Sequence, residues 1–242
     1  MEEKWNSRTE LLIGKQAVKK LEQAKVIVYG IGGVGSFAVE ALARAGIGRF
    51  VLVDNDVISI SNLNRQIHAN IDTIGKRKID VMKQRILKIN PNAKVDIYLG
   101  QELEKGEEEL IDSTFSYVID AVDTVSTKLK LILKANELNV PIISAMATGN
   151  KLNPTKLEIT DIYKTSVCPL CKIIRKELKK KNVKKLKVVY SKENPKKIEK
   201  ANDNNKKTIA SISFMPSVAG LYIAYEVVKD IIEINLLNNK EQ

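Results

Sequence analysis

The sequence has few of the residues from which disulfide frameworks, metal sites and catalytic triads are built. It contains two cysteines and one histidine in 242 residues. Two cysteines cannot form a disulfide framework. With His68 as the single imidazole, no Ser/His/Asp arrangement can be assembled. We therefore expect a function that does not depend on a histidine-activated nucleophile of the protein.

Long apolar runs are also missing. No stretch approaches the roughly 20 consecutive apolar residues of a membrane span. The N-terminus carries Glu2, Glu3 and Lys4 and has no apolar core of a signal peptide. There are no internal repeats. We expect a cytoplasmic protein in which residues 1–242 form a single domain.

Acidic residues are scarce in one part of the chain. The formal net charge is +11, and residues 172–207 alone contain 15 Lys or Arg and 4 Asp or Glu. The rest of the chain is therefore neutral. Such a block is a solvated face or loop, or a landing surface for a polyanion. The composition alone leaves both interpretations open.

What is present is a glycine-rich turn between a strand and a helix. The apolar run Val26–Tyr29 enters a turn with four glycines, and a helical pattern follows as far as Gly46. The glycines are Gly30, Gly32, Gly33 and Gly35. Gly30 allows the tight turn, Gly32 lets the backbone approach a phosphate, and free N–H groups at the helix start face that anion.

A second strand, residues 50–53, ends at Asp54. This carboxylate follows Gly35 by 19 positions, where it can accept hydrogen bonds from a ribose. The strand, turn, helix and acidic residue together predict nucleotide binding.

Alternating segments predict an α/β fold with a Rossmann-like, doubly wound, mostly parallel sheet and helices on both faces. We expect an N-terminal helical extension (1–24), with Val18 and Leu21 on its inner face, and a nucleotide-binding core (25–150). A mixed C-terminal part (151–242) contains the basic segment 172–207. Further expected elements are a short acidic helix over 104–111, strands over 155–163 and 209–214, a mobile loop over 191–208, and a last helix that opens at Pro216.

Cations near the expected strand ends favour ATP over NAD, because a triphosphate carries more charge and usually takes Mg²⁺. Arg65 can hold phosphates in a forked geometry, and Lys78 is a point charge at a helix start. Asp123 is placed to bind Mg²⁺. The alternative is that Arg65 and Lys78 are surface ion-pair residues and that Asp123 is the N-cap of its helix.

The chain resembles the adenylating superfamily that includes ubiquitin-activating enzymes and the bacterial activators of thiamine and molybdopterin sulfur carriers. The resemblance is carried by the glycine turn 30–36 and by Asp54-x-Asp56, Ser61-Asn62-x-x-Arg65-Gln66, Lys78 and Asp120-x-x-Asp123. It implies that Asp54 binds ribose, that Asn62, Arg65 and Lys78 bind phosphates, and that Asp123 binds Mg²⁺. Asp56 and Gln66 belong to the same nucleotide site. Arg65, Lys78 and Asp123 are the expected catalytic residues, and transfer of AMP to a carboxylate is the implied reaction.

Within that superfamily the chain is most similar to the tRNA threonylcarbamoyladenosine dehydratases. The strings that carry this are 64–69, Asp161-x-x-Lys164-Thr165, Pro169-Leu170, Arg175-x-x-Leu178-Lys179 and 188–191. The resemblance implies adenylation of the threonyl carboxylate of a modified adenosine in tRNA, followed by closure of the carbamoyl oxygen to a cyclic oxazolone. The nucleophile then lies in the substrate, so that positioning and charge neutralisation suffice for catalysis.

Cys168 and Cys171 have the spacing of half a zinc knuckle. Relatives with structural zinc carry two such pairs. The sequence leaves open two packing residues at a helix start, a redox or sulfur-relay pair, or zinc shared across a dimer. His68 is expected to be a packing residue rather than a base.

The superfamily habit implies a homodimer. Sulfur-carrier activators use an N-terminal arginine that reaches the neighbouring subunit, but Arg8 lies three positions before the expected place, where Leu11 stands. A competing function is activation of a ubiquitin-like sulfur carrier, with a cysteine desulfurase or sulfur acceptor as partner. A third is an NAD-binding sensor. The basic segment and the single cysteine pair favour tRNA.

Overall fold

A computed structural model describes residues 4–100, 106–198 and 209–232. Its centre is a seven-stranded sheet in the order β3-β2-β1-β4-β5-β7-β6. Every neighbouring pair is parallel except β6 with β7. The strands are β1 (Lys25–Tyr29), β2 (Arg49–Val53), β3 (Lys94–Tyr98), β4 (Tyr117–Asp120), β5 (Ile142–Ala145), β6 (Leu157–Asp161) and β7 (Lys187–Ser191). The predicted α/β class and mostly parallel sheet are confirmed.

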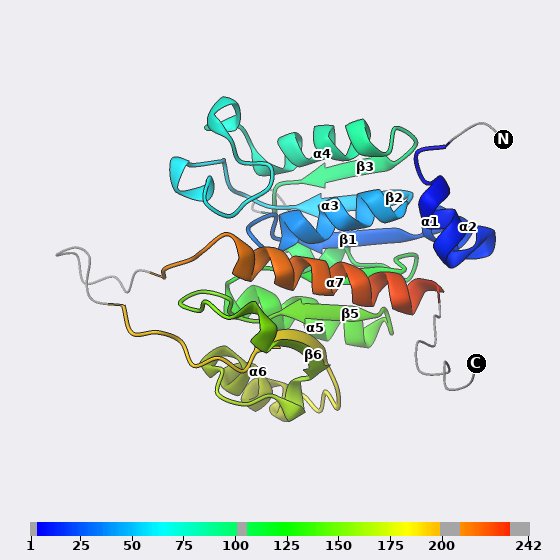
Figure 1. Cartoon of the computed structure of the whole chain (residues 1–242). Helices are drawn as coiled ribbons and strands as arrows, with labels where there is room; N and C mark the ends of the chain where they lie inside the picture. Colours follow the sequence, from blue (N-terminus) through cyan, green and yellow to red (C-terminus); the bar gives the residue numbers. More distant parts are fainter. Residues whose placement is uncertain (1–3, 101–105, 199–208, 233–242) are drawn as a thin grey trace, which may run out of the picture.

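Helices cover both faces of this sheet (Figure 1). They are α1 (Ser7–Ile13), α2 (Lys15–Gln23), α3 (Gly35–Ala45), α4 (Lys78–Ile89), α5 (Val125–Glu137), α6 (Pro169–Lys180) and α7 (Phe214–Ile232). On one face α3, α4 and α7 share a core with Val26, Val28 and Leu52. On the other, α5 packs on Ile27 and Val51, and α6 extends that layer under β7.

Central parallel strands are buried on both faces, so they read as continuous apolar runs. Val26–Tyr29 and Phe50–Val53 show this pattern, and both stretches are buried. The N-terminal extension is confirmed as α1 and α2, with Val18 and Leu21 of α2 buried. None of the described helices combines the length and the apolar character needed to cross a bilayer.

One predicted strand is wrong, and the described part of the acidic helix is shorter than predicted. Residues 209–213 form no strand, because their hydrogen bonds go to Asn150 and Asn64 instead of a neighbouring strand. Helix α7 therefore begins at Phe214, with Pro216 as its third residue, where a missing N–H is still tolerated. The acidic segment forms a 3₁₀ helix, Glu107–Leu110, which begins after Gly106 (φ +100°). Residues 104 and 105 lie outside the described residues.

The C-terminal part is mixed, as predicted. The expected strand 155–163 is β6 (Leu157–Asp161) between two 3₁₀ turns, Pro154–Lys156 and Ile162–Lys164. Residues 192–198 have no helix or strand. The remainder of the predicted loop 191–208 lies outside the described residues from 199 onward.

Candidate active site

The carboxyl ends of β1, β2, β4 and β5 meet at one edge of the sheet, at the left of Figure 1. Tyr29 is paired in register with Val53 on one side and with Asp120 on the other. Gly30, Asp54 and Ala121, the residues that follow, therefore leave the sheet at the same level. In doubly wound sheets ligands bind outside these ends.

The glycine turn is packed too closely for side chains at two positions. Gly30 has φ +85°, and a Cβ there would lie 2.6 Å from the Ala121 carbonyl oxygen. A Cβ on Gly35 would lie 1.9 Å from the Gly30 oxygen. At Gly32 the nearest atom, Gln66 Nε2, is 3.9 Å away, so this part of the turn is open. Gly30 and Gly35 are therefore required for the packing of the fold, while the open backbone at Gly32 leaves room for a ligand.

The start of α3 has no side-chain cap at its N-cap residue, Val34. The first N–H groups of a helix have no partner within the helix and carry a partial positive charge. Because this end of α3 follows the open turn, it is suited to a phosphate.

Asp54 braces the turn. Its Oδ2 accepts from the Ile31 N–H at 2.5 Å, and its Oδ1 accepts from the Asp56 N–H at 2.8 Å. Burial raises the pKa of the Asp54 carboxyl, and the charge of Lys78 opposes this. A carboxylate oxygen has two lone pairs, so each oxygen can still accept a ribose hydroxyl.

Lys78, the first residue of α4, is paired with Asp56. Lys78 Nζ lies 2.6 Å from Asp56 Oδ2, and the two side chains are 6% and 68% exposed. The suggestion that Lys78 is an ion-pair residue is thus correct, although the lysine is buried and not on the surface. Its exposed partner can exchange for a phosphate without leaving the ammonium group unpaired.

The loop 55–77 brings Arg65 and Gln66 against the glycine turn, and Asn62 lies in the same loop. Asn62 is buried and its Oδ1 accepts from the Ser59 N–H at 3.2 Å. Arg65 Nη1 donates to Ser61 O and to Asn64 Oδ1, both at 2.9 Å. A Cβ on Gly33 would lie 3.4 Å from Arg65 Cγ. Within the described chain no carboxylate pairs with Arg65, so its guanidinium is bound by neutral acceptors alone.

Buried polar atoms in this loop have no partner. Gln66 Oε1 and both ring nitrogens of His68 make no hydrogen bond, and the residues are 6% and 2% exposed. An unpaired buried acceptor is costly, and the Gln66 amide lies against the open turn. A ligand hydroxyl or amine there would satisfy Gln66 Oε1, so the residues present fit a nucleotide. Burial lowers the pKa of His68 to about 4, with Lys78 and Arg85 contributing, so the ring is neutral.

Asp123 is exposed after β4, and its Oδ1 lies 3.3 Å from the Thr124 hydroxyl. The N-cap residue of α5 is Thr124, so the alternative reading of Asp123 as the cap is wrong. No three His, Cys, Asp or Glu side chains gather into a metal-binding group in the described part of the chain. A single carboxylate still fits Mg²⁺, which is often bound by one or two carboxylates together with phosphates and water.

Sequence reasoning missed a buried ion pair at the same edge. Lys128 Nζ lies 2.7 Å from Asp120 Oδ2 and 2.9 Å from Ala145 O, and both charged side chains are fully buried. Ser144 also donates to Asp120, and Asp120 Oδ1 accepts from the Val122 N–H at 3.2 Å. The pair joins the ends of β4 and β5 to the loop before Asp123. Its sequence signal is a lysine at a core position of α5, in line with Leu131, Ile132 and Ala135.

The segment before α7 also borders the site, although sequence reasoning placed it in a strand elsewhere. A Cβ on Gly33 would lie 3.0 Å from the Pro216 Cβ. Asn64 Nδ2 donates to Ser211 O at 3.2 Å. Arg8 is not part of this edge, since α1 lies where the strands begin (Figure 1).

The two cysteines lie at the start of α6, away from the turn. Cys168 is the N-cap residue, Cys171 is in the first turn, and both thiols are free and buried. A hydrogen bond from Cys171 lowers the pKa of Cys168 to about 5, and the same bond raises the pKa of Cys171. Both residues also pack in the core under β7, as the packing interpretation expects.

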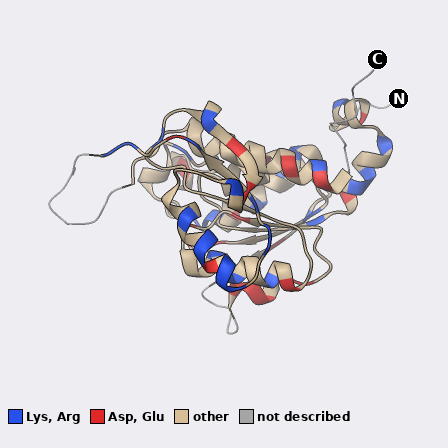
Figure 2. Ribbon diagram, turned by 90° about the horizontal axis from the view of Figure 1, so that it is seen from below, with Lys and Arg blue, Asp and Glu red and all other residues tan. Residues whose placement is uncertain are grey.

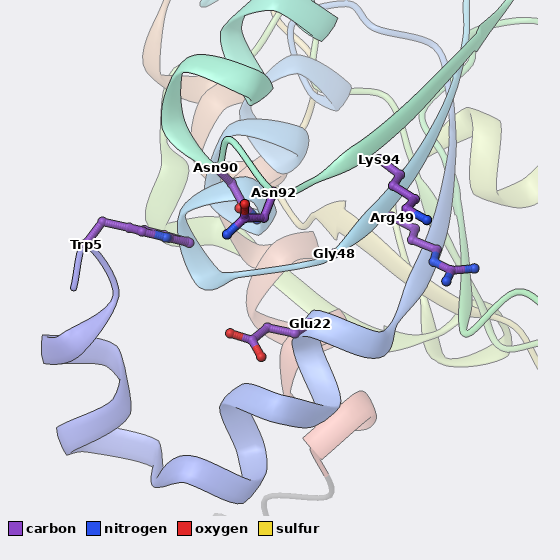
Figure 3. Close-up of a pocket in the computed structure, with 7 residues that line it drawn as sticks. All are labelled: Trp5, Glu22, Gly48, Arg49, Asn90, Asn92 and Lys94. Atoms are coloured by element: carbon purple, nitrogen blue, oxygen red, sulfur yellow. The ribbon is translucent and has the colours of Figure 1, made fainter.

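A cavity of about 330 Å³ lies at the opposite edge (Figure 3). It is lined by Trp5, Glu22, Gly48, Arg49, Asn90, Asn92 and Lys94. Trp5 borders one side, while Arg49 and Lys94 lie at the other, away from the indole. None of the predicted site residues contributes to it, and its lining mixes both charge signs. It is not the nucleotide site.

Comparison with known proteins finds relatives that match this chain over nearly its whole length. The chain is 42% identical over 249 residues to the tRNA threonylcarbamoyladenosine dehydratase of Bacillus subtilis, covering 97% of this chain and 98% of that protein. Structures of E. coli tRNA N6-threonylcarbamoyladenosine dehydratase, TcdA, in complex with ATP and with AMP both superpose with a TM-score of 0.80, at 31% and 32% identity. Each superposition covers 94% of this chain and 93% of the other. The ThiF family pattern matches residues 6–242, and the chain therefore belongs to the ThiF family.

Proposed function

We propose that this protein is an ATP-dependent enzyme that cyclises threonylcarbamoyladenosine in tRNA. The observation that carries the proposal is 42% identity, over nearly the whole length of both chains, to a protein with that dehydratase name. The open glycine turn with Arg65 and Lys78 beside it is consistent with a triphosphate substrate.

In the proposed reaction a threonyl carboxylate oxygen attacks the α-phosphorus of ATP, and pyrophosphate leaves. The carbamoyl oxygen then attacks the activated carbonyl, AMP leaves, and the oxazolone ring closes with net loss of water. Charge develops on phosphate oxygens in the first step. The start of α3, Arg65 and Lys78 are the groups that would neutralise it, while Asp54 and Gln66 hold the nucleoside.

We infer that Asp123 binds Mg²⁺ together with the phosphates. Its exposed carboxylate follows β4 at the same edge as the glycine turn. Mg²⁺ held there by Asp123 would supply positive charge to offset that of the leaving pyrophosphate. The buried Asp120–Lys128 pair would hold the loop in which Asp123 lies.

The basic segment 172–207 is the proposed tRNA-binding surface. Its described part includes α6, whose exposed residues include Lys172, Lys176, Lys179 and Lys180. Figure 2, which views the molecule from the side of α6, shows Lys and Arg along this helix. Positive charge of this density binds phosphates with little sequence preference.

We further propose a homodimer in the cytoplasm, built from one adenylating domain per chain. No residue of α1 is buried, and its Leu11 and Leu12 are 87% and 85% exposed. Leu221 and Tyr225 are half exposed on α7. Neighbouring large apolar side chains exposed in this way mark an interaction surface, and a second copy would cover them. The shared sheet, with strands from both 25–150 and 151–242, supports the single domain.

Activation of a ubiquitin-like sulfur carrier is the alternative, with a cysteine desulfurase or sulfur acceptor as partner. No feature of the described residues favours it over tRNA. Mass spectrometry of tRNA nucleosides tests the proposal: incubation with protein, ATP and Mg²⁺ should convert the threonylcarbamoyl nucleoside to a product lighter by one water. Unchanged tRNA together with ATP-dependent labelling of a carrier C-terminus would favour the alternative.

A further inference from the structure

Residues 209–214 form one border of the candidate active site. Ser211 accepts from Asn64, which precedes Arg65 in the loop over the glycine turn. Pro216, two residues after Phe214, is the residue that a Cβ on Gly33 would meet. Whatever reaches the glycine turn with a reactive carboxylate therefore passes close to this segment.

The segment is fixed in place by its backbone. Asn150, which has a left-handed backbone (φ +60°), binds Ala210 twice: its Oδ1 accepts from the Ala210 N–H at 2.7 Å, and its N–H donates to Ala210 O at 2.8 Å. Gly149 makes room for the neighbour, because a Cβ there would lie 2.3 Å from Ile209 Cγ2.

Despite this anchoring, two large apolar side chains of the segment face outward. Ile209 is 73% exposed and Phe214 is 40% exposed. An anchored backbone that holds apolar side chains in solvent beside an active site indicates a binding surface.

A stretch that carries two lysines is bound to the same residue, Asn150. The Lys196 N–H donates to Asn150 O at 2.7 Å, so the stretch with Lys196 and Lys197 runs beside residues 209 and 210. Both lysines are exposed. The nearby acid, Glu193, is already bound to the Leu152 and Asn153 N–H groups at 3.0 and 2.8 Å. The border thus carries exposed apolar side chains as well as exposed lysines.

We propose that Ile209 and Phe214 form the surface on which an unpaired base of the RNA substrate lies, next to the nucleotide that reacts, while Lys196 and Lys197 bind adjoining phosphates. The inference rests on the proposed tRNA function. Proteins read single-stranded RNA by stacking bases on aromatic side chains beside a basic groove. The lysines complement phosphates, which favours RNA over a second copy of this basic chain as the occupant.

Fluorescence anisotropy with an RNA hairpin that reproduces a tRNA anticodon arm tests this. Phe214→Ala should weaken binding about tenfold, within the range for loss of one base–aromatic stack, and leave the salt dependence unchanged. Lys196→Gln/Lys197→Gln should flatten the slope of log affinity against log salt by about 0.7 for each lost contact with single-stranded RNA. Phe214→Tyr should retain affinity.

Tyr225→Ala is the matched control, an exposed aromatic on the same helix about 16 Å farther along its axis. It should bind the hairpin as the unchanged protein does. A 2-aminopurine placed in the hairpin loop should be quenched on binding to the unchanged protein, and less so by Phe214→Ala. ATP affinity should be the same in all variants.

Three outcomes would overturn the inference. One is equal hairpin affinity and quenching for Phe214→Ala and the unchanged protein. Another is dissociation of a dimer by Phe214→Ala in light scattering, which would give the surface to a second copy. A third is an equal loss of ATP affinity, which would make Phe214 a wall of the nucleotide site. If the unchanged protein binds neither tRNA nor the hairpin, the proposed function itself fails.

Discussion

Arg65 packs its side chain beside Gly33, and its guanidinium is bound by two neutral acceptors, Ser61 O and Asn64 Oδ1. A developing phosphate charge would therefore gain a forked partner without breaking an ion pair. Arg65→Ala should lower the rate of ATP-dependent pyrophosphate release by about 100-fold or more, the loss expected when one charge-stabilising donor is removed. Steady-state assays of pyrophosphate release with substrate tRNA would measure this.

Arg49→Ala is the control for that experiment, because Arg49 is an exposed arginine at the opposite edge of the sheet. It should retain the rate of the unchanged protein. Equal activity of Arg65→Ala and Arg49→Ala would contradict the placement of the phosphates beside the turn.

His68 should make the stability of the fold depend on pH. Its pKa of about 4 lies below the ordinary value of 6.5, because burial disfavours the charged ring and Lys78 and Arg85 add to this. Between these two values the unfolded chain binds more protons than the folded one. Folding is therefore weakened as the pH falls through 6.5 toward 4, by about 2 kcal/mol between pH 7 and pH 5.

Urea unfolding at both pH values checks this, with His68→Gln as the comparison. His68 is the single histidine of the sequence, so the variant has no imidazole. Its loss of unfolding free energy on acidification should be about 2 kcal/mol smaller than that of the unchanged protein. Parallel losses in the two proteins would show that the ring titrates normally when folded.

At this scale, spacing along the chain predicted which residues lie at the site edge but not how they pair. Gly30, Asp54 and Asp123 follow strand ends, and strand ends are visible as apolar runs. The bond between Lys78 and Asp56 joins residues 22 positions apart. The Asp120–Lys128 pair depends on full burial of both charges. The Lys78–Asp56 pairing has no local signal. A lysine at a core position of α5 indicates that Lys128 is buried, but it does not identify Asp120 as the partner, because each pairing arises from packing of separate elements.

Helix α7 is the element whose packing reaches the nucleotide site. Gly220 lies against α3, and a Cβ there would be 2.4 Å from the Val34 carbonyl oxygen in the glycine turn. Gly220→Ala would force the helix away from this backbone. We expect a loss of about 1–3 kcal/mol in unfolding free energy from overpacking and weaker ATP binding, because Val34 precedes the open start of α3. Chemical unfolding and calorimetric ATP titration measure the two effects.

The neighbouring residue supplies the control. Leu221→Ala shortens a side chain on the exposed side of α7 to the same methyl group and adds no atoms against α3, since Leu221 is 48% exposed. It should cost less than about 1 kcal/mol and leave ATP affinity unchanged. If both substitutions changed ATP affinity equally, the packing of Gly220 against Val34 would not influence ATP binding.

Helices and strands with a clear pattern of apolar residues could be predicted from the sequence. Segments fixed by hydrogen bonds from distant side chains could not. The buried strands β1, β2 and β4 are continuous apolar runs, and α2 shows one apolar face with Val18 and Leu21. Residues 209–214 carry spaced apolar residues that suit a strand. Asn150 and Asn64, both remote in sequence, take the hydrogen bonds that a strand would need, so no local pattern could identify this segment.

At the scale of the whole molecule, the excess positive charge and the proposed nucleotide-binding residues lie in different parts of the sequence. The excess of +11 lies within residues 172–207, while the glycine turn, Asp54, Arg65 and Asp123 precede that segment. On the proposed function, tRNA affinity and ATP affinity should therefore respond to different substitutions. A variant with glutamine at Lys179, Lys180, Lys181, Lys184 and Lys185, all exposed, tests this division.

The five-lysine variant should bind tRNA more weakly, and its log affinity should depend less on log salt by about 0.9 for each lysine that contacts a duplex phosphate. Its ATP affinity should stay within about twofold, since screening weakens fields beyond roughly 10 Å at moderate salt. Glutamine at Lys15, Lys19, Lys20, Lys83 and Lys88 of α2 and α4 removes the same charge elsewhere and is the control. Binding measured at several salt concentrations separates a local surface from net charge. If both variants lose the same slope, tRNA responds to the overall charge and α6 is only a solvated face.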